Sequence, residues 1–246
     1  MKIKFLGTSS ALPLPRINCQ GRQICLSKDP KDQRLRSSLL IDNRILVDCG
    51  PDVYTQLLRA GMPVIEAIIF THRHGDHING FKLNFKEPQT AEVKLYGPKE
   101  VFKRIRNEYK FKNSAHIYKN GEALDFDAFT VNPLKIDHEG LDNYGLLIST
   151  NKRLFYAPDI EAIPKITLEV IKEADILVVD GSILNGPHYG HIGIDRLLEI
   201  IKPLNKETYF THIGIGNPPH KELVKYVKEK GGDNFNVAFD GMELEI

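Results

Sequence analysis

The residues between positions 72 and 77 carry the clearest chemical signal in this sequence of 246 residues. They include His72, His74, Asp76 and His77, directly after the apolar, strand-like run 67–71. A strand that ends here would bring all four side chains to one edge of a sheet, and imidazole and carboxylate groups are ligands for zinc, manganese or iron. His72 and His74 can bind one ion and Asp76 and His77 a neighbouring one, and two such ions together activate water and polarise an ester. A solvated, histidine-rich turn is the alternative, but this density of ligands behind a buried strand favours a metal site.

Further candidate ligands follow other apolar strands along the chain. His138 and His212 each come directly after such a run, and Asp159 and Asp180 close two more. Polar groups at the ends of buried strands need partners, and a metal ion is one such partner. Because a carboxylate can bridge two cations and an imidazole cannot, we expect Asp159 to be shared between two ions. Asp180 is the rival bridge, but we expect it to cap the turn at Gly181-Ser182.

The overall composition excludes several classes of protein. Apolar residues make up 41% and charged residues 26%, as in an ordinary globular domain, and we expect one domain over residues 1–246. The formal net charge of +1 gives no field that would by itself select nucleic acid or a membrane. The N-terminus lacks a signal-peptide core, and no apolar stretch approaches the roughly 20 residues that span a bilayer. Three cysteines, an odd number, argue against a disulfide framework and favour the reducing cytoplasm.

The pattern of apolar residues predicts alternating strands and helices in both halves of the chain. Strands are expected over residues 2–6, 38–48, 67–71, 92–96, 128–136, 144–149, 153–156, 175–180, 207–211 and 236–245. Helices are expected over residues 52–60, 99–109, 164–173, 193–201 and 219–230. Two mixed sheets packed face to face, with helices outside, would satisfy this order.

Three segments together resemble the metallo-β-lactamase-fold hydrolases, and the resemblance covers essentially the whole chain. They are the 72–77 motif, the opening Phe5–Ser10 and the segment Leu46–Gly50. The resemblance implies an α/β (α+β) fold, an αββα four-layer sandwich in which two mixed β-sheets are flanked by helices, with a dimetal site at one edge. It implies two ligand sets, with Asp159 shared between them: His72, His74 and His138 for one ion, and Asp76, His77 and His212 for the other. It also implies that Asp48 orients a ligand imidazole.

Other segments resemble one branch of this superfamily, the phosphoribosyl 1,2-cyclic phosphate phosphodiesterases. These segments are Asp32–Ser38, Thr211–Ile213 and Ala238–Leu244. The resemblance implies a dimetal hydrolase that cleaves a small, cyclic ribose-type phosphodiester with a metal-bridging hydroxide as nucleophile. The tRNA 3′-processing endonucleases share the opening and the metal motif, but this chain has no Gly-rich insertion that could form their long RNA-binding arm. A lactone or thioester hydrolase on the same metal site is a further alternative.

Two residues are expected to take part directly in catalysis. Asp76 would bind one ion and accept a hydrogen bond from the hydroxide. His191 lies in a glycine-containing loop before a helix that starts near Ile194, and it matches a histidine of the phosphodiesterases that contacts the phosphate and protonates the leaving oxygen. An imidazole with a pKa near neutrality suits that transfer. The alternative is that His191 only packs the start of the helix, and His188 is the spare candidate.

The chain departs from the phosphodiesterase pattern at a structural zinc site. Cys25 matches the last cysteine of that cluster, but Gln20 and Arg22 occupy the other cysteine positions and Ile215 occupies the histidine position. We therefore expect no structural zinc, and we expect Cys19 and Cys25 to be ordinary thiols. His116 and His220 are expected at the surface.

Two segments, residues 16–36 and 99–112, are locally basic. Such faces would attract a small anionic phosphate ester if they flank the metal site, although solvated surface explains them as well. Aromatic residues are not interleaved with these charges, so a nucleic-acid partner is open but not favoured, and no membrane partner is expected. A homodimer is compatible with the sequence. The expected cofactors are two divalent ions, zinc or manganese, with iron as a further candidate.

Overall fold

The computed structural model of the chain contains two β-sheets that pack face to face, and it describes residues 1–85, 93–108, 115–186 and 189–246. The first sheet has the strand order β14-β1-β2-β3-β4-β5-β6. Its strands are β1 (Lys2–Gly7), β2 (Ser38–Ile41), β3 (Ile45–Val47), β4 (Ala67–Ile69), β5 (Lys94–Gly97), β6 (Ala115–Ile117) and β14 (Glu243–Glu245). The second sheet has the order β13-β12-β11-β10-β9-β8-β7. Its strands are β7 (Leu124–Asp125), β8 (Thr130–Lys135), β9 (Tyr144–Ser149), β10 (Arg153–Ala157), β11 (Ile176–Asp180), β12 (Glu207–Thr211) and β13 (Phe235–Val237).

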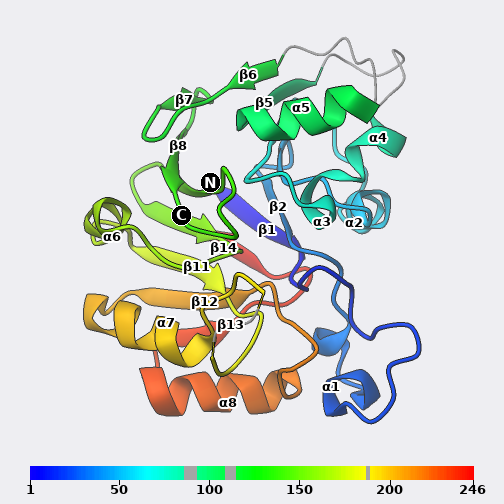
Figure 1. Cartoon of the computed structure of the whole chain (residues 1–246), viewed down its shortest axis with the longest axis vertical. Coiled ribbons are helices and arrows are strands. Elements are labelled where there is room, and N and C mark those ends of the chain that lie inside the picture. Colours follow the sequence, from blue (N-terminus) through cyan, green and yellow to red (C-terminus); the bar gives the residue numbers. More distant parts are fainter. Residues whose placement is uncertain (86–92, 109–114, 187–188) are drawn as a thin grey trace.

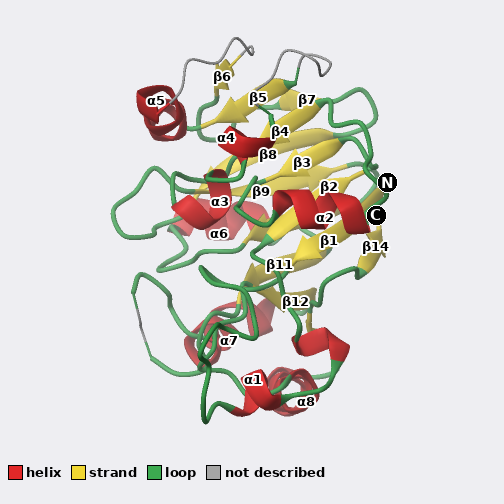
Figure 2. Cartoon of the chain, turned by 90° about the vertical axis from the view of Figure 1, so that its right-hand side faces the viewer, coloured by secondary structure: helices red, strands yellow, loops and turns green. Residues whose placement is uncertain are grey.

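Helices cover the outer faces of both sheets. They are α1 (Gln23–Leu26), α2 (Val53–Arg59), α3 (Gly75–Ile78), α4 (Phe81–Asn84), α5 (Lys99–Glu108), α6 (Lys165–Ile171), α7 (Ile194–Ile201) and α8 (His220–Gly231). In Figure 1, helices α2 to α5 lie on one side of the strands and α6 to α8 on the other. Strand β1 pairs with β14, so the two chain ends lie side by side, as Figure 2 also shows.

Alternation along the strands produces the layers. In β10, Leu154 and Tyr156 point into the core between the sheets, whereas Phe155 and Ala157 point toward the helices on the outer face. Because successive strand side chains face opposite ways, a strand that is apolar throughout must be covered on both faces. Burial of a large apolar side chain such as Leu154 or Phe155 contributes about 1.5–3 kcal/mol to the stability of the fold. The four-layer αββα arrangement with two mixed sheets therefore agrees with the predicted fold.

Both sheets contain parallel strands whose carboxyl ends meet at one edge. Strands β3, β4, β5 and β6 pair in parallel in the first sheet. Strands β10, β11, β12 and β13 do so in the second. Loops that leave the carboxyl ends of parallel strands are free to carry functional side chains, because the strands themselves are buried.

The predicted elements are found, and the differences are local. The predicted strand 38–48 is a hairpin, because Asp42 and Asn43 take left-handed φ values of 47° and 53° and turn the chain. The predicted strand 236–245 is likewise two strands, β13 and β14, in different sheets. Residue 92 of one predicted strand and residue 109 of one predicted helix lie outside the described residues. The short elements β6, β7, α1, α3 and α4 were not predicted, since two to four residues hold too little periodicity.

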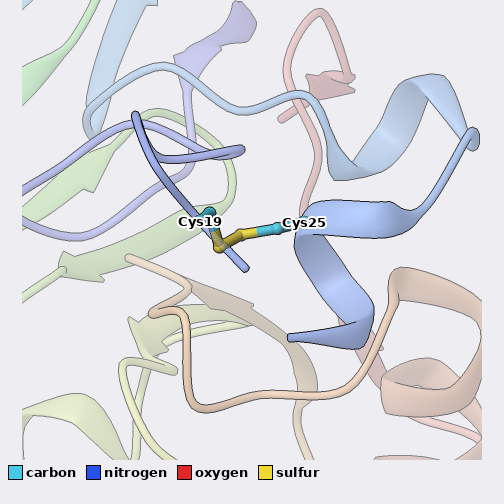
Figure 3. Close-up of a disulfide and its surroundings, with 2 residues drawn as sticks. All are labelled: Cys19 and Cys25. Carbon is cyan, nitrogen blue, oxygen red and sulfur yellow. A yellow bond between two sulfur atoms is a disulfide. The ribbon is translucent and has the colours of Figure 1, made fainter. Parts of the chain in front are cut away.

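The prediction that Cys19 and Cys25 are ordinary thiols is wrong. Their sulfurs form a disulfide, with the Cα atoms 6.1 Å apart, beside helix α1 (Figure 3). Asn18, just before Cys19, and Gly21, inside the loop, have positive φ, and the turns they make bring the two cysteines within bonding reach. Cys49 is free and buried.

The surface position expected for His220 is also wrong, whereas His116 is exposed as expected. His220 is 6% exposed, and its Nδ1 accepts a hydrogen bond of 3.0 Å from the guanidinium of Arg34. Arg34 also donates to Thr8 Oγ1 and to the carbonyl of Ala238, so this buried cation ties the N-terminal loop to the start of α8 and the C-terminal segment. A buried guanidinium needs such partners, and His220 is one of them.

Candidate metal centre

The first group of predicted ligands gathers beyond the end of β4. His72 Nε2 lies 3.1 Å from Asp159 Oδ2, and His138 Nε2 lies 3.1 Å from His74 Nδ1 and 3.5 Å from the same carboxylate oxygen. His72, His138 and Asp159 are buried, and His74 is half-buried. One donor atom from each of these four residues therefore faces a common point, drawn from both sheets.

The second group lies beside the first. His77 Nε2 is 3.2 Å from Asp76 Oδ2, and His212 Nε2 is 3.5 Å from the same oxygen. Helix α3 carries Asp76 and His77, whereas His212 follows β12 of the other sheet. All three side chains converge as the sequence predicts, although their role as ligands stays a prediction.

Asp159 occupies the position between the two groups. Its Oδ2 lies 3.1 Å from His72 Nε2 of the first group and 3.4 Å from His77 Nε2 of the second, and its Oδ1 lies 3.1 Å from His212 Nε2 of the second. A carboxylate that contacts two donor sets at once has a position suited to bridging two cations.

The spacing and the chemistry of the donors fit divalent ions. Tetrahedral coordination with bonds of about 2.0–2.1 Å places neighbouring ligand atoms about 3.3 Å apart, within the 3.1–3.5 Å observed here. Several of these buried atoms have no hydrogen-bond partner among the described residues: His72 Nε2, His77 Nε2, Asp159 Oδ1 and His212 Nε2. Buried polar atoms without partners are costly, so a cation between them would satisfy the whole set.

The pKa shifts within the cluster also favour the binding of cations. Burial lowers the pKa of His72 to about 3, so its imidazole stays neutral and keeps a lone pair for a metal. Burial opposes charge on His77 too, but the carboxylates of Asp76, Asp159 and Asp48 outweigh it and raise the His77 pKa well above its usual value. Burial likewise opposes charge on Asp159, yet His212, His77 and His72 hold its pKa well below the usual range. The ionised carboxylates thus make the donor cluster favourable for a positive charge.

Hydrogen bonds fix the orientation of two of the imidazoles. Asp48 Oδ2 lies 2.7 Å from His77 Nδ1, and its carboxylate also accepts from the backbone N–H and hydroxyl of Thr71. Asp48 therefore occupies the orienting position that the sequence suggested. His138 Nδ1 lies 2.9 Å from the carbonyl of Gly190. With Nδ1 so engaged, Nε2 of both rings is left for a ligand.

Two of these residues have an unusual backbone conformation. Asp48 and His212 both have φ of 58°, in the left-handed region that non-glycine residues seldom adopt. Each follows a buried parallel strand directly, so the left-handed turn swings the side chain from the strand direction into the cluster. Such conformations persist where the surroundings hold them, and they concentrate at functional sites.

A close backbone contact sets the position of Asp76. A Cβ atom on Gly50 would lie 1.9 Å from the carbonyl oxygen of Asp76, and one on Gly80 would lie 1.8 Å from the carbonyl oxygen of Gly50. Only glycine allows the turn after β3 to approach α3 so closely. These close contacts explain why glycine occupies positions 50 and 80, before and after the 72–77 motif.

His191 lies next to both groups and pairs with Asp180. Its Nδ1 is 2.6 Å from Asp180 Oδ2, and its ring centroid is 5.2–5.3 Å from those of His138 and His212. Burial alone would lower the pKa of His191, but Asp180 outweighs it and raises the pKa to about 9. Asp180 also accepts from the backbone N–H of Ser182, the turn-capping role that was expected. Its pairing with His191 was missed, although an acid at a strand end and a histidine before a helix were both visible in the sequence.

The basic segments lie partly beside this cluster. Arg16 and Arg22 line a pocket that His191 also lines, whereas Arg36 pairs with Asp52. In the second segment, Arg104 donates to the carbonyl of Arg73 inside the motif. Lys110 and Lys112 lie outside the described residues, as does His188.

Comparison with known proteins agrees with this fold. Residues 43–213 match the family described as Beta-lactamase superfamily domain. A solved structure described as a diphosphatase from the PhnP family superposes with a TM-score of 0.86 and 29% identity, and the match covers 100% of this chain and 97% of that one. No helix among the described residues is long and apolar enough to cross a membrane.

Two curated relatives are similar over parts of their own length. An octanoyltransferase of Porphyromonas gingivalis is 28% identical over 100% of this chain but only 52% of that protein. A ribonuclease Z of Marinobacter nauticus is 30% identical over 87% of this chain and 62% of that protein. The chain therefore spans between half and two thirds of the length of these relatives.

Proposed function

We propose that this chain, which belongs to the beta-lactamase superfamily, is a dimetal hydrolase that cleaves a small phosphodiester, with a cyclic ribose-type phosphate as the preferred substrate class. The observation that carries the proposal is the His191–Asp180 pair beside the two donor groups. Ester hydrolysis needs an acid for the leaving oxygen in addition to an activated water, and this pair supplies it on the pocket side of the cluster.

The ligand set divides between two ions. His72, His74 and His138 would hold one, and Asp76, His77 and His212 the other, with Asp159 shared. When bound, two divalent ions act as Lewis acids on the phosphoryl oxygens and lower the pKa of water. Zinc and manganese are the proposed metals, with iron as a further candidate, because all three accept imidazole and carboxylate.

The side chains around the ligands have separate tasks. Asp48 holds the His77 ring by its Nδ1. His77 and His212 outweigh burial and depress the pKa of Asp76, so its carboxylate is ionised and able to accept a hydrogen bond from the attacking water. Asp180 holds Nδ1 of His191 and favours the imidazolium, so Nε2–H can be donated to the leaving oxygen. A preorganised acid of this kind typically contributes 10²–10⁴ in rate.

The relatives support a hydrolase but leave the substrate open. The structure similar over the whole chain is described as a diphosphatase, a name that indicates hydrolysis at phosphorus. Similarity to a ribonuclease Z makes RNA cleavage the second candidate. The octanoyltransferase match covers about half of that protein, so its named activity carries no weight here. The cytoplasmic location and the homodimer stay predictions.

A substrate panel on protein of defined metal content tests the proposal. The panel contains bis(p-nitrophenyl) phosphate, cyclic nucleotides, ribose cyclic phosphates, lactones and precursor tRNA. Turnover of the small phosphodiesters above that of the other substrates is expected. Activity on a lactone alone would overturn the substrate class, and cleavage of precursor tRNA alone would favour the ribonuclease.

A further inference from the structure

Glu139 directly follows the candidate ligand His138 and lies beside a second one, His74. Its Oε2 is 3.5 Å from His74 Nε2, so a small rotation of either side chain brings the two atoms to the usual length of a hydrogen bond. The side chain of Glu139 is 43% exposed and that of His74 is 29% exposed. The contact therefore lies at the rim of the donor cluster, on the side of the first group.

Backbone and packing limit where the carboxylate of Glu139 can go. Its backbone is in the left-handed region, with φ of 48°, and its N–H donates to Glu161 Oε2 at 2.7 Å. On the other side lies Gly190, where a Cβ atom would be 2.5 Å from Glu139 Cγ and 3.1 Å from Oε1. Because glycine has no Cβ, the side chain of Glu139 can lie against this backbone, whose carbonyl also holds His138. The carboxylate is thereby confined to the side of His74.

The two ring nitrogens of His74 face different neighbours. Nδ1 faces the donor cluster, 3.1 Å from His138 Nε2, whereas Nε2 faces Glu139. A neutral imidazole carries a proton on one nitrogen and a lone pair on the other. A carboxylate beside Nε2 favours the proton at Nε2, which leaves the lone pair of Nδ1 for an ion in the cluster.

Two other candidate imidazoles are held in the same manner, by a partner outside the ligand set. His77 Nδ1 lies 2.7 Å from Asp48 Oδ2, and His138 Nδ1 lies 2.9 Å from a backbone carbonyl. Histidines that bind metals almost always donate their second ring N–H to a carboxylate, a carbonyl or water. Glu139 is the group in the described part of the chain whose position suits this part for His74.

We propose that Glu139 is a positioning residue of the metal centre, which holds the His74 ring by Nε2 and directs Nδ1 to the ion of the first group. The inference rests on the proposed function, which assigns His74 to that ion. Glu139 also places a negative charge near the ion without binding it, and opposite charges attract at this range. Each donor group then has its own orienting carboxylate, Glu139 in the first and Asp48 in the second.

Zinc affinity tests this role without any assay of activity. Metal-free protein is titrated with zinc in competition with a chromophoric chelator, and the wild-type protein should bind two ions. Glu139→Ala should weaken one of them by about 10–100-fold and leave the other unchanged, because Glu139 contacts the first group alone. Glu139→Gln should recover part of the loss, since its amide oxygen still accepts. The matched control is Glu173→Ala, at an exposed glutamate after α6. Affinities in Glu139→Ala equal to those of the control would overturn the proposal.

A second measurement separates this inference from the proposed function. If the wild-type protein binds no zinc, the dimetal proposal fails, and Glu139 is judged on the metal-free protein by NMR of the ring nitrogens, at a pH where His74 is neutral. We expect the proton of His74 on Nε2 in the wild type and shared between both nitrogens in Glu139→Ala. The signals are assigned by their absence in His74→Gln. Identical His74 signals in Glu139→Ala and Glu173→Ala would refute the positioning role.

Discussion

Asp180 and His191 form a short hydrogen bond, 2.6 Å between Oδ2 and Nδ1, beside the proposed metal ligands, and with His212 they form a third group of possible donors. The carboxylate is held in turn by the backbone N–H groups of Ile160 and Ser182. A buried acid with this many donors is fixed in place, so it fixes the imidazole as well. The pair is therefore placed as the proposed proton donor beside the candidate metal centre.

Replacing His191 removes that donor without touching the ligand set. His191→Ala is expected to retain both ions and to lose at least ~10² in kcat. Metal content by mass spectrometry and turnover of bis(p-nitrophenyl) phosphate measure the two effects. His116→Ala, at an exposed histidine of β6, should behave as the wild type. A His191→Ala protein with the wild-type rate would remove this residue from the mechanism.

The pH profile depends on Asp180. His191 acts in its protonated form, and with a pKa of about 9 that form predominates at neutral pH and is lost as the pH rises through 9. In Asp180→Asn the neutral side chain no longer offsets burial, so the pKa of His191 falls. The alkaline limb of kcat/KM should then move toward neutral pH. A limb at the same pH in both proteins would show that another group controls it.

The bridging position of Asp159 predicts a loss of metal as well as activity. Asp159→Ala removes a ligand from both donor groups, so both ions should be bound more weakly. Metal content after gel filtration checks this, with Asp233→Ala at an exposed aspartate after α8 as the control. Full occupancy in Asp159→Ala would mean that the bridge is another residue.

Asp48 is expected to act through His77. Asp48→Asn keeps the shape of the side chain but weakens the hydrogen bond to Nδ1, and changes of this kind typically cost 10–100-fold in metal affinity. Competition with a chelator of known zinc affinity measures the effect. Undiminished affinity would show that the contacts of Thr71 and the strand ends suffice to orient the ring.

His220 predicts a pH-dependent stability that is separate from catalysis. Burial and the charge of Arg34 lower its pKa to about 4 in the folded protein, whereas the unfolded chain binds a proton near pH 6.5. Between these values the unfolded state binds more protons, so stability rises with pH through the window and is lost on acidification. His220→Asn retains an acceptor for Arg34 but cannot titrate. Urea unfolding at pH 6.5 and pH 4.5 should show that the variant loses about 1–3 kcal/mol less than the wild type. Equal losses would contradict this account.

The sequence predicts the convergence of the candidate ligands because several of them follow a run whose periodicity marks a buried strand. His72 and His212 follow strands β4 and β12, whose parallel neighbours end at the same edge, whereas His138 follows the antiparallel strand β8. The pairing of His191 with Asp180 is harder to foresee, since it depends on how the loop after β11 folds back. The burial of His220 depends on Arg34, a residue far away in the sequence that shows only as part of a basic segment. Contacts between loops leave no periodic signal, and the disulfide at Cys19 belongs to the same class.

The two sheets contribute donors from opposite halves of the chain, with consequences for assembly. Synthesis proceeds from the N-terminus, so His72, His74, Asp76 and His77 leave the ribosome long before β12 and His212 exist. During that interval the early half can offer an ion only an incomplete set of donors. With the proposed ligands, tight capture of both ions would therefore be a late event of biogenesis that marks the meeting of the two halves.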